Sequence, residues 1–177
     1  MSSEQTRVLI TGGTGTLGRA LVKDFVAAGI LPVVLTRQSA SPEPIAEGAQ
    51  WMQGDLVTGE GLRDALHGID HVVHVATLPA KGPFRHDSSA DVLGTRRLIH
   101  ACQDTRMEWM LYVSVVGIEA VPIAYYRSKL EAEALVKNSK LPVRPSPCYP
   151  GFPRSSDASR QVSDAAALPY LTDQLAR

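Results

Sequence analysis

The chain of 177 residues lacks features that would place it in several large classes of protein. Its two cysteines, Cys102 and Cys148, are too few for a disulfide framework and have no metal-binding spacing. No apolar run approaches the length of a membrane span, and residues 1–6 are polar where a secretory signal would be apolar. Lys plus Arg equals Asp plus Glu at 18 each, so no net charge attracts nucleic acid or an anionic membrane. We therefore expect a cytoplasmic protein without nucleic-acid or membrane partners.

The histidines are also not arranged as metal ligands. His71 and His74 lie three residues apart in an apolar segment that reads as a strand, and such residues face opposite sides of a sheet. His86 and His100 have no partners at ligand spacing. We predict no metal site and interpret these side chains as surface or packed imidazoles.

What the chain does have is a glycine-rich turn between an apolar strand and an amphipathic helix. Val8-Leu9-Ile10 leads into Thr11-Gly12-Gly13-Thr14-Gly15-Thr16-Leu17-Gly18, which fits both G-x-G-x-x-G and G-x-x-G-x-x-G. Glycine permits the turn, the approach of backbone to a pyrophosphate and the close packing of helix on strand. The free N–H groups of the helix would bind the phosphate. The pattern predicts dinucleotide binding, and a purely structural turn is the alternative.

The rest of the chain alternates strand and helix patterns. Further apolar strands are predicted at residues 32–35, 50–56, 70–77 and 109–116, and a capping box at Ser88 opens a helix. Another helix begins at Tyr125, with Leu130, Ala134 and Leu135 on one face and Glu133 and Lys137 on another. This alternation predicts an α/β fold, a doubly wound Rossmann-type parallel sheet of order 3-2-1-4-5, over residues 1–143.

The residues after the second strand bear on cofactor choice. NAD sites of this kind carry an acidic residue there, whereas an arginine accommodates the 2′-phosphate of NADP. This chain has Arg37 and no acid between Pro32 and Pro42, which favours NADP over NAD, although Arg37 could be a solvated charge. Asp55 ends the third strand, where it lies near the adenine or caps a turn.

A catalytic pattern follows the fifth strand. Tyr125 and Lys129 are four residues apart, on one helix face, so the ammonium would favour the phenolate and make it usable as an acid or base. Ser114, at the carboxyl end of the fifth strand, could hold a carbonyl oxygen by a hydrogen bond.

Together these motifs resemble the short-chain dehydrogenase/reductase family over about residues 6 to 142, and most closely its atypical NAD(P)H-binding, NmrA-like branch. The resemblance implies that Arg37 binds the 2′-phosphate, and that Tyr125 is the acid/base, with Tyr126 the less favoured candidate. It implies that Lys129 also holds the nicotinamide ribose and that Ser114 orients the carbonyl. The other implied cofactor residues are Gly12, Thr14, Gly15, Thr16, Leu17 and Gly18 around the pyrophosphate, Asp55 and Leu56 at the adenine, and Ala76 and Thr77 toward the nicotinamide.

The predicted function is that of an NADP-dependent oxidoreductase acting on a small carbonyl or quinone-like substrate, whose identity the sequence does not reveal. The resemblance also allows a non-catalytic NADP-sensing regulator with a protein partner, or an inactive, truncated member of the family. Fold alone does not choose between them.

Residues 144–177 depart from the family pattern. Six of the twelve prolines lie between Pro142 and Pro169, and proline donates no hydrogen bond to a sheet. We expect an irregular tail, which we interpret as frame-shifted, with the sixth strand and the substrate region absent. A native proline-rich tail, disordered or bound to a partner, is the alternative, and the encoding DNA would decide between them.

Overall fold

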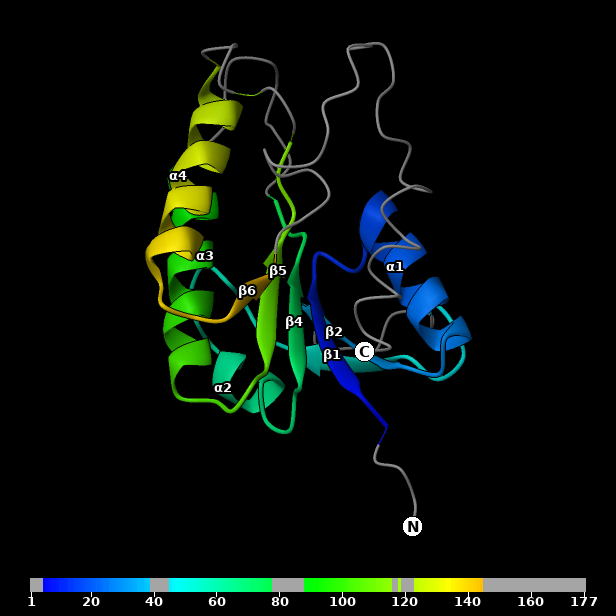
Figure 1. Cartoon of the computed structure of the whole chain (residues 1–177). Helices are drawn as coiled ribbons and strands as arrows, with labels where there is room; N and C mark the ends of the chain where they lie inside the picture. The colour runs from blue at the N-terminus through cyan, green and yellow to red at the C-terminus, as the bar shows by residue number, and fades with distance from the viewer. Residues whose placement is uncertain (1–4, 39–44, 78–87, 116–117, 119–122, 145–177) are drawn as a thin grey trace.

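The computed structural model describes residues 5–38, 45–77, 88–115, 118 and 123–144, which form a single parallel sheet with helices on both faces (Figure 1). The strands lie in the order β3-β2-β1-β4-β5-β6, and every pairing is parallel. Their bounds are β1 (Arg7–Thr11), β2 (Leu31–Thr36), β3 (Gln50–Gln53), β4 (His71–His74), β5 (Trp109–Tyr112) and β6 (Val143–Arg144). The helices are α1 (Thr16–Ala27), α2 (Leu62–Ala65), α3 (Ser88–Gln103) and α4 (Ala124–Asn138). The predicted Rossmann-type fold is confirmed.

The edge beyond β5 differs from the expectation that the sheet would stop at five strands. Val143 and Arg144 pair with Met110 and Leu111 of β5 as a sixth parallel strand of two residues. An edge strand needs only one row of ladder hydrogen bonds, and Pro142 and Pro145 flank this strand without lying in it. The predicted tail from residue 145 onward lies outside the described residues.

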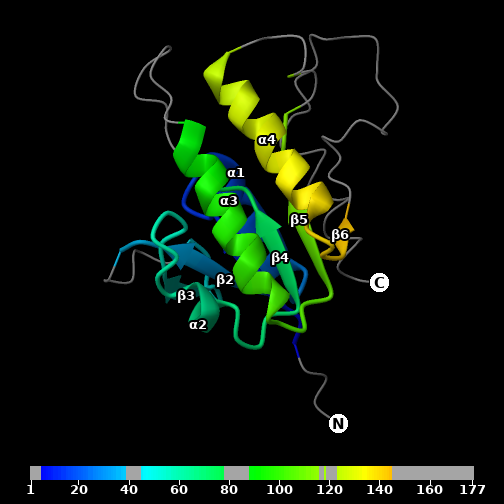
Figure 2. The same cartoon turned by 90° about the vertical axis from the view of Figure 1, so that its left-hand side faces the viewer.

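Two apolar layers hold the helices to the sheet. Alternate residues of each strand face opposite sides, so Leu9 and Val72 pack with α2, α3 and α4, whereas Val8 and Val73 pack with α1. Figures 1 and 2 show this arrangement, with α1 on one side of the sheet and the other three helices on the opposite side. The inner strands are thus covered on both faces, and in open sheets of this kind ligands bind outside the carboxyl ends of the strands.

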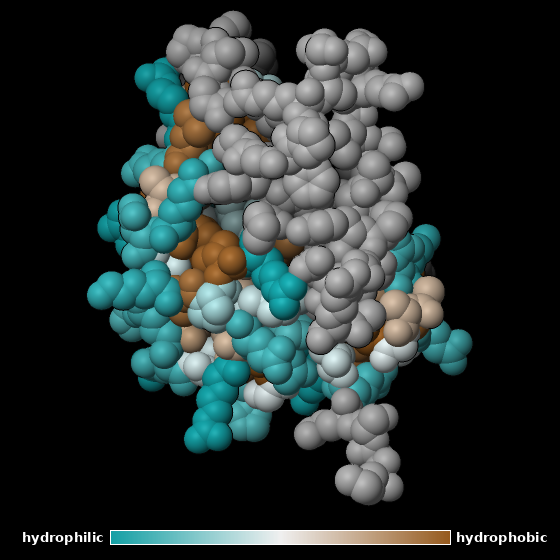
Figure 3. Space-filling model, viewed as in Figure 1, coloured by the Kyte–Doolittle hydropathy of each residue, from teal (hydrophilic) through white to brown (hydrophobic). Residues whose placement is uncertain are grey.

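Most of the described surface in Figure 3 is hydrophilic, with apolar surface visible over β6 and near the start of α4. Val143 and Ile123, at these two places, keep 38% and 45% of their surface exposed. Across the described residues, no helix has both the length and the apolar character that crossing a membrane requires.

Candidate functional site

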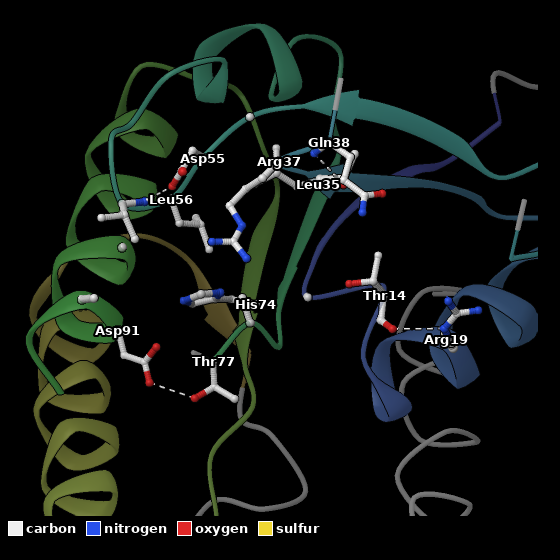
Figure 4. Close-up of a pocket in the computed structure, with 17 residues that line it drawn as sticks. Thr14, Arg19, Leu35, Arg37, Gln38, Asp55, Leu56, His74, Thr77 and Asp91 are labelled. Atoms are coloured by element: carbon white, nitrogen blue, oxygen red, sulfur yellow. Dashed lines mark hydrogen bonds between the residues drawn. The ribbon is translucent and has the colours of Figure 1, made fainter. Parts of the chain in front are cut away.

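A pocket of about 440 Å³ lies at the carboxyl ends of β1, β2, β3 and β4, against the first turns of α3 (Figure 4). Its lining includes seven of the residues predicted to bind the cofactor: Gly12, Thr14, Arg37, Asp55, Leu56, Ala76 and Thr77. A volume of this size suits a small organic ligand. The residues Gly15, Thr16, Leu17 and Gly18 lie in the turn and the first part of α1, beside this lining rather than in it.

The glycine turn has the shape that a pyrophosphate requires. Gly12 has a φ of +75°, and a Cβ at this position would lie 2.7 Å from Cα of Ala76. A Cβ at Gly18 would meet the backbone of Gly12 and Gly13, so glycine there lets α1 lie against the turn. Gly15 caps α1 without a side-chain hydrogen bond, and the first turn carries no acidic residue. The amino-terminal N–H groups and the positive end of the helix therefore suit an anion.

The ends of β2 and β3 form the next wall of the pocket. Arg37 is exposed and enters the pocket from the end of β2 in Figure 4. Asp55 accepts the N–H of Val57 at 2.6 Å and the N–H of Thr58 at 3.4 Å, and it also lines the pocket. Asp55 thus caps a turn, which is one of the two interpretations that its sequence position left open, and its role at the adenine stays a prediction.

His74, a buried residue of the pocket lining, links three elements through hydrogen bonds. The Thr95 hydroxyl donates to the Asp91 carbonyl at 2.9 Å, so its oxygen accepts the Nε2–H of His74 at 3.0 Å. The Nδ1 of His74 then accepts the Thr11 hydroxyl at 2.6 Å, and Thr11 in turn accepts the N–H of Ala76 at 3.3 Å. Burial, with a smaller contribution from the Lys129 charge, lowers the pKa of His74 to about 3. A neutral imidazole therefore joins β1, β4 and α3.

His71 plays no part in this network. It stacks on Trp109 with 4.2 Å between ring centroids, on the α1 side of the sheet, so the two histidines face opposite ways as predicted. The sequence interpretation of packed imidazoles holds for both, but it did not identify His74 as a lining residue of the pocket. The partners of His74 lie 63 and 21 residues away, which leaves no local pattern to find it.

Asp91 is a second residue that sequence reasoning did not assign to the site. It stands in the first turn of α3, lines the pocket, and accepts the Thr77 hydroxyl at 2.8 Å (Figure 4). The capping-box pattern explained the start of the helix but gave no indication that α3 begins over the end of β4. Arg19 of α1 also lines the pocket without having been predicted.

Ser114 lies just after the end of β5, and Tyr125 and Lys129 lie on α4. Ser114 is 4% exposed, and its hydroxyl donates to the carboxylate of Glu133. The predicted helix has Ala134 on its apolar face and Glu133 on another face, and this is wrong: Glu133 is buried and Ala134 is exposed. The Ser114 hydroxyl thus donates its proton to a carboxylate of the protein. The predicted role, in which this hydroxyl orients a substrate carbonyl, did not include such a partner.

The electrostatics around Tyr125 also differ from the sequence argument. Burial raises the pKa of the Tyr125 phenol, and a hydrogen bond with Thr77 acts in the opposite direction. Lys129 is 4% exposed and holds its Nζ 5.1 Å from the centre of the Tyr112 ring. Burial lowers the pKa of Lys129, while the charges of Asp91 and Glu133 raise it. Tyr125 is therefore a protonated phenol at neutral pH, and its raised pKa makes it a weaker acid than a solvent-exposed phenol.

Comparison with known proteins adds a family to this geometry. A sequence family described as NAD(P)H-binding matches residues 12–145. The chain is 33% identical over 173 residues to the 4-hydroxy-2-methyl-3-oxo-4-farnesyl-3,4-dihydroquinoline-1-oxide ketoreductase of Stigmatella aurantiaca, covering 97% of this chain and 49% of that one. It is 32% identical over 113 residues to the 2-alkyl-3-oxoalkanoate reductase of Stenotrophomonas maltophilia, covering 63% and 34%.

A solved structure gives the same fold. The Bordetella bronchiseptica enzyme WbmG in complex with NAD and UDP superposes with a TM-score of 0.65 at 25% identity, over 80% of this chain and 52% of that chain. The chain thus spans about half or less of the length of the proteins that it matches here. The family match over residues 12–145 includes the glycine turn, the residues that line the pocket and α4.

Proposed function

Because this chain belongs to the NAD(P)H-binding family, we propose that it binds NADP and reduces a small carbonyl or quinone-like substrate. The observation that carries the proposal is the pocket at the strand ends, which brings residues of the glycine turn together with Arg37, Asp55 and Thr77. Tyr125 supports the reductase part, because its hydrogen bond with Thr77 links the candidate proton donor to the wall of that pocket.

The residues present fit a phosphorylated dinucleotide. The uncapped start of α1 offers N–H groups to a pyrophosphate, and Arg37 offers a guanidinium to a 2′-phosphate. Leu56 offers apolar surface to the adenine, and Ala76 and Thr77 would face the nicotinamide half. Lys129 would hold the ribose hydroxyls next to that half.

In the proposed reaction, the hydride for the carbonyl carbon would come from NADPH held by these residues. The protein would have to supply one proton to the oxygen, and Tyr125 is the candidate donor, since its phenol is protonated at neutral pH and is hydrogen-bonded to Thr77 of the pocket wall. Asp91 accepts the Thr77 hydroxyl and so fixes the side chain next to Tyr125. The names of the ketoreductase and of the 3-oxoalkanoate reductase are consistent with a carbonyl group as the class of substrate.

A second candidate is a non-catalytic NADP sensor, which the NmrA-like resemblance allows. Two observations favour it: the Ser114 hydroxyl is directed to Glu133, and the pKa of Tyr125 is raised, which weakens the phenol as an acid. In such a protein Tyr125 and Lys129 would position the ribose without catalysing a reaction, and a protein partner would distinguish the NADP-bound form from the free form.

NADPH binding followed by turnover separates the two candidates. Binding is measured by the change in NADPH fluorescence, and turnover by the loss of NADPH absorbance with a panel of ketones, aldehydes and quinones. For an enzyme, Tyr125→Phe should abolish turnover and leave binding intact, whereas the matched control Tyr126→Phe should retain both. Binding without turnover on any member of the panel would contradict the reductase proposal and fit either the sensor or the inactive, truncated member that the resemblance also allows.

A further inference from the structure

Glu133 is a buried acidic residue to which the proposed function gives no role. It stands on α4 four residues after Lys129, so the two side chains are neighbours on one face of the helix. Only 7% of the surface of Glu133 is exposed, and a glutamate is almost never buried to this extent without partners. Its burial therefore requires groups that hold the carboxylate inside the protein.

The two oxygens of the Glu133 carboxylate have different partners. One accepts the Ser114 hydroxyl in a buried, charge-assisted hydrogen bond, and the other lies 3.8 Å from the Nζ of Lys137. The Lys137 side chain is 48% exposed, so solvent screens its pair with Glu133. Ser114 therefore fixes the position of the carboxylate, and the exposed pair does not remove the effect of its charge on the protein interior.

Lys129 is the buried cation beside this carboxylate. It is 4% exposed, and its Nζ lies 5.1 Å from the centre of the Tyr112 ring. None of the ion pairs between described residues includes Lys129. Burial lowers the pKa of Lys129, and the charges of Asp91 and then of Glu133 raise it. Two carboxylates on different helices thus oppose the desolvation of one ammonium.

The imidazole and the phenols around Lys129 add no charge at neutral pH. His74 of β4 is neutral, because burial lowers its pKa to about 3. Burial raises the pKa of Tyr112 on β5 and of Tyr125 on α4, so both phenols stay protonated. Within the described residues, the two carboxylates of α3 and α4 are therefore the charges that face this ammonium.

We propose that Glu133 is a positioning residue of the cofactor site: held by Ser114, its carboxylate keeps the Lys129 ammonium charged and in place to bind the ribose hydroxyls. The inference rests on the proposed function, which assigns the ribose to Lys129. Asp91 lines the pocket, whereas Glu133 lies outside this lining and acts on Lys129 from within the protein. A charged donor forms stronger hydrogen bonds than a neutral amine does, so losing this carboxylate should weaken cofactor binding wherever it costs Lys129 its proton.

The test compares the 177-residue chain with two variants that each lose one negative charge from α4. Glu133→Gln keeps an amide oxygen that can accept the Ser114 hydroxyl, and Glu131→Gln, at an exposed position, is the matched control. The titration of Lys129 is followed by NMR of chains with isotope-labelled lysine, and its signal is assigned by its loss in Lys129→Met. The midpoint should fall by about one pH unit in Glu133→Gln, the lower end of the effect of a nearby opposite charge, and stay at the wild-type value in Glu131→Gln.

NADPH binding is measured by fluorescence over the same range of pH. The pH at which binding is half lost should fall in Glu133→Gln by as much as the Lys129 midpoint does, and it should not move in Glu131→Gln. At about pH 6, where the ammonium is charged in every variant, binding should be nearly equal to that of the wild type. A purely structural role of Glu133 would instead weaken binding at every pH.

Four outcomes would contradict the inference. An unchanged Lys129 midpoint in Glu133→Gln, or an equal shift in Glu131→Gln, would overturn it and leave the proposed function intact. A shifted midpoint without a matching change in NADPH binding would overturn the ribose role of Lys129 and the inference with it. If Glu133→Gln does not fold, the double variant with Lys129→Met should fold, because it removes the uncompensated buried cation, and its failure to fold would overturn the inference. A wild-type chain that binds no NADPH would contradict the proposed function itself, on which the inference rests.

Discussion

Lowering the pH should destabilise the folded protein through His74, because only the unfolded chain can protonate this side chain readily. In the fold, burial and the Lys129 charge lower the pKa of His74 from 6.5 to about 3. As the pH falls below 6.5, the unfolded state binds a proton that the folded state does not bind. The free energy of unfolding therefore falls with the pH across the interval between these two pKa values.

The size of this effect follows from one proton and the two pKa values. At pH 7 the imidazole of the unfolded chain is mostly neutral, so the contribution of His74 to the pH dependence is close to zero. At pH 5 it amounts to about 2 kcal/mol of lost stability, since a difference of one pKa unit corresponds to about 1.4 kcal/mol. Such a loss is a large part of the stability of a typical domain, which is about 5–15 kcal/mol.

Urea unfolding followed by tryptophan fluorescence between about pH 7 and pH 5 measures the effect. His74→Gln should be less stable at pH 7, because the links to Thr11 and Thr95 are lost, but its stability should fall by about 2 kcal/mol less on acidification. His100→Gln, at an exposed position of α3, should keep the wild-type pH dependence. Parallel curves for wild type and His74→Gln would refute the neutral, buried imidazole.

Three further substitutions or treatments probe the site and its surroundings. Gly18→Ala should impair NADPH binding and cost about 1–3 kcal/mol of stability, because the new Cβ meets the backbone of Gly12; wild-type values for both would contradict the packing described. Ser114→Ala should destabilise the protein by about 1–3 kcal/mol by depriving buried Glu133 of its donor, and unchanged unfolding with abolished turnover would instead place this hydroxyl on the substrate. Burial raises the pKa of the Cys102 thiol to about 12, so iodoacetamide should alkylate it slowly in the native protein and fully in denaturant, and rapid native labelling detected by mass spectrometry would disprove its burial.

The sequence was sufficient for the parts of the site that depend on local pattern and on strand order. The glycine turn combines a short motif with a strand before it and a helix after it, so residues 12–18 could be placed with their neighbours. Strand order then places Arg37 and Asp55 beside it, because the carboxyl ends of parallel strands meet at one edge of the sheet, whereas Thr77 follows from the family resemblance; all three line the pocket. The predicted strands at 70–77 and 109–116 extend past β4 and β5, which end at His74 and Tyr112.

The residues that sequence reasoning missed depend on contacts between distant segments. His74 is defined by partners on β1 and α3, and Asp91 enters the pocket only because α3 starts over the end of β4. Glu133 has a charged side chain at a position that packing buries against Ser114. The short strand β6 was missed because the prolines that follow it dominated the local pattern. The assignment of residues 145–177 remains a prediction.

The central claim, an NADP site at the ends of these strands, is tested most directly by comparing two cofactors on one substitution. The dissociation constants of NADPH and NADH are measured by calorimetry for the wild-type chain and for Arg37→Asp. We predict that the wild type binds NADPH more tightly than NADH, and that Arg37→Asp weakens NADPH binding far more than NADH binding, because only NADPH presents a 2′-phosphate to the guanidinium. Equal changes for the two cofactors, or no binding of either by the wild type, would contradict the account.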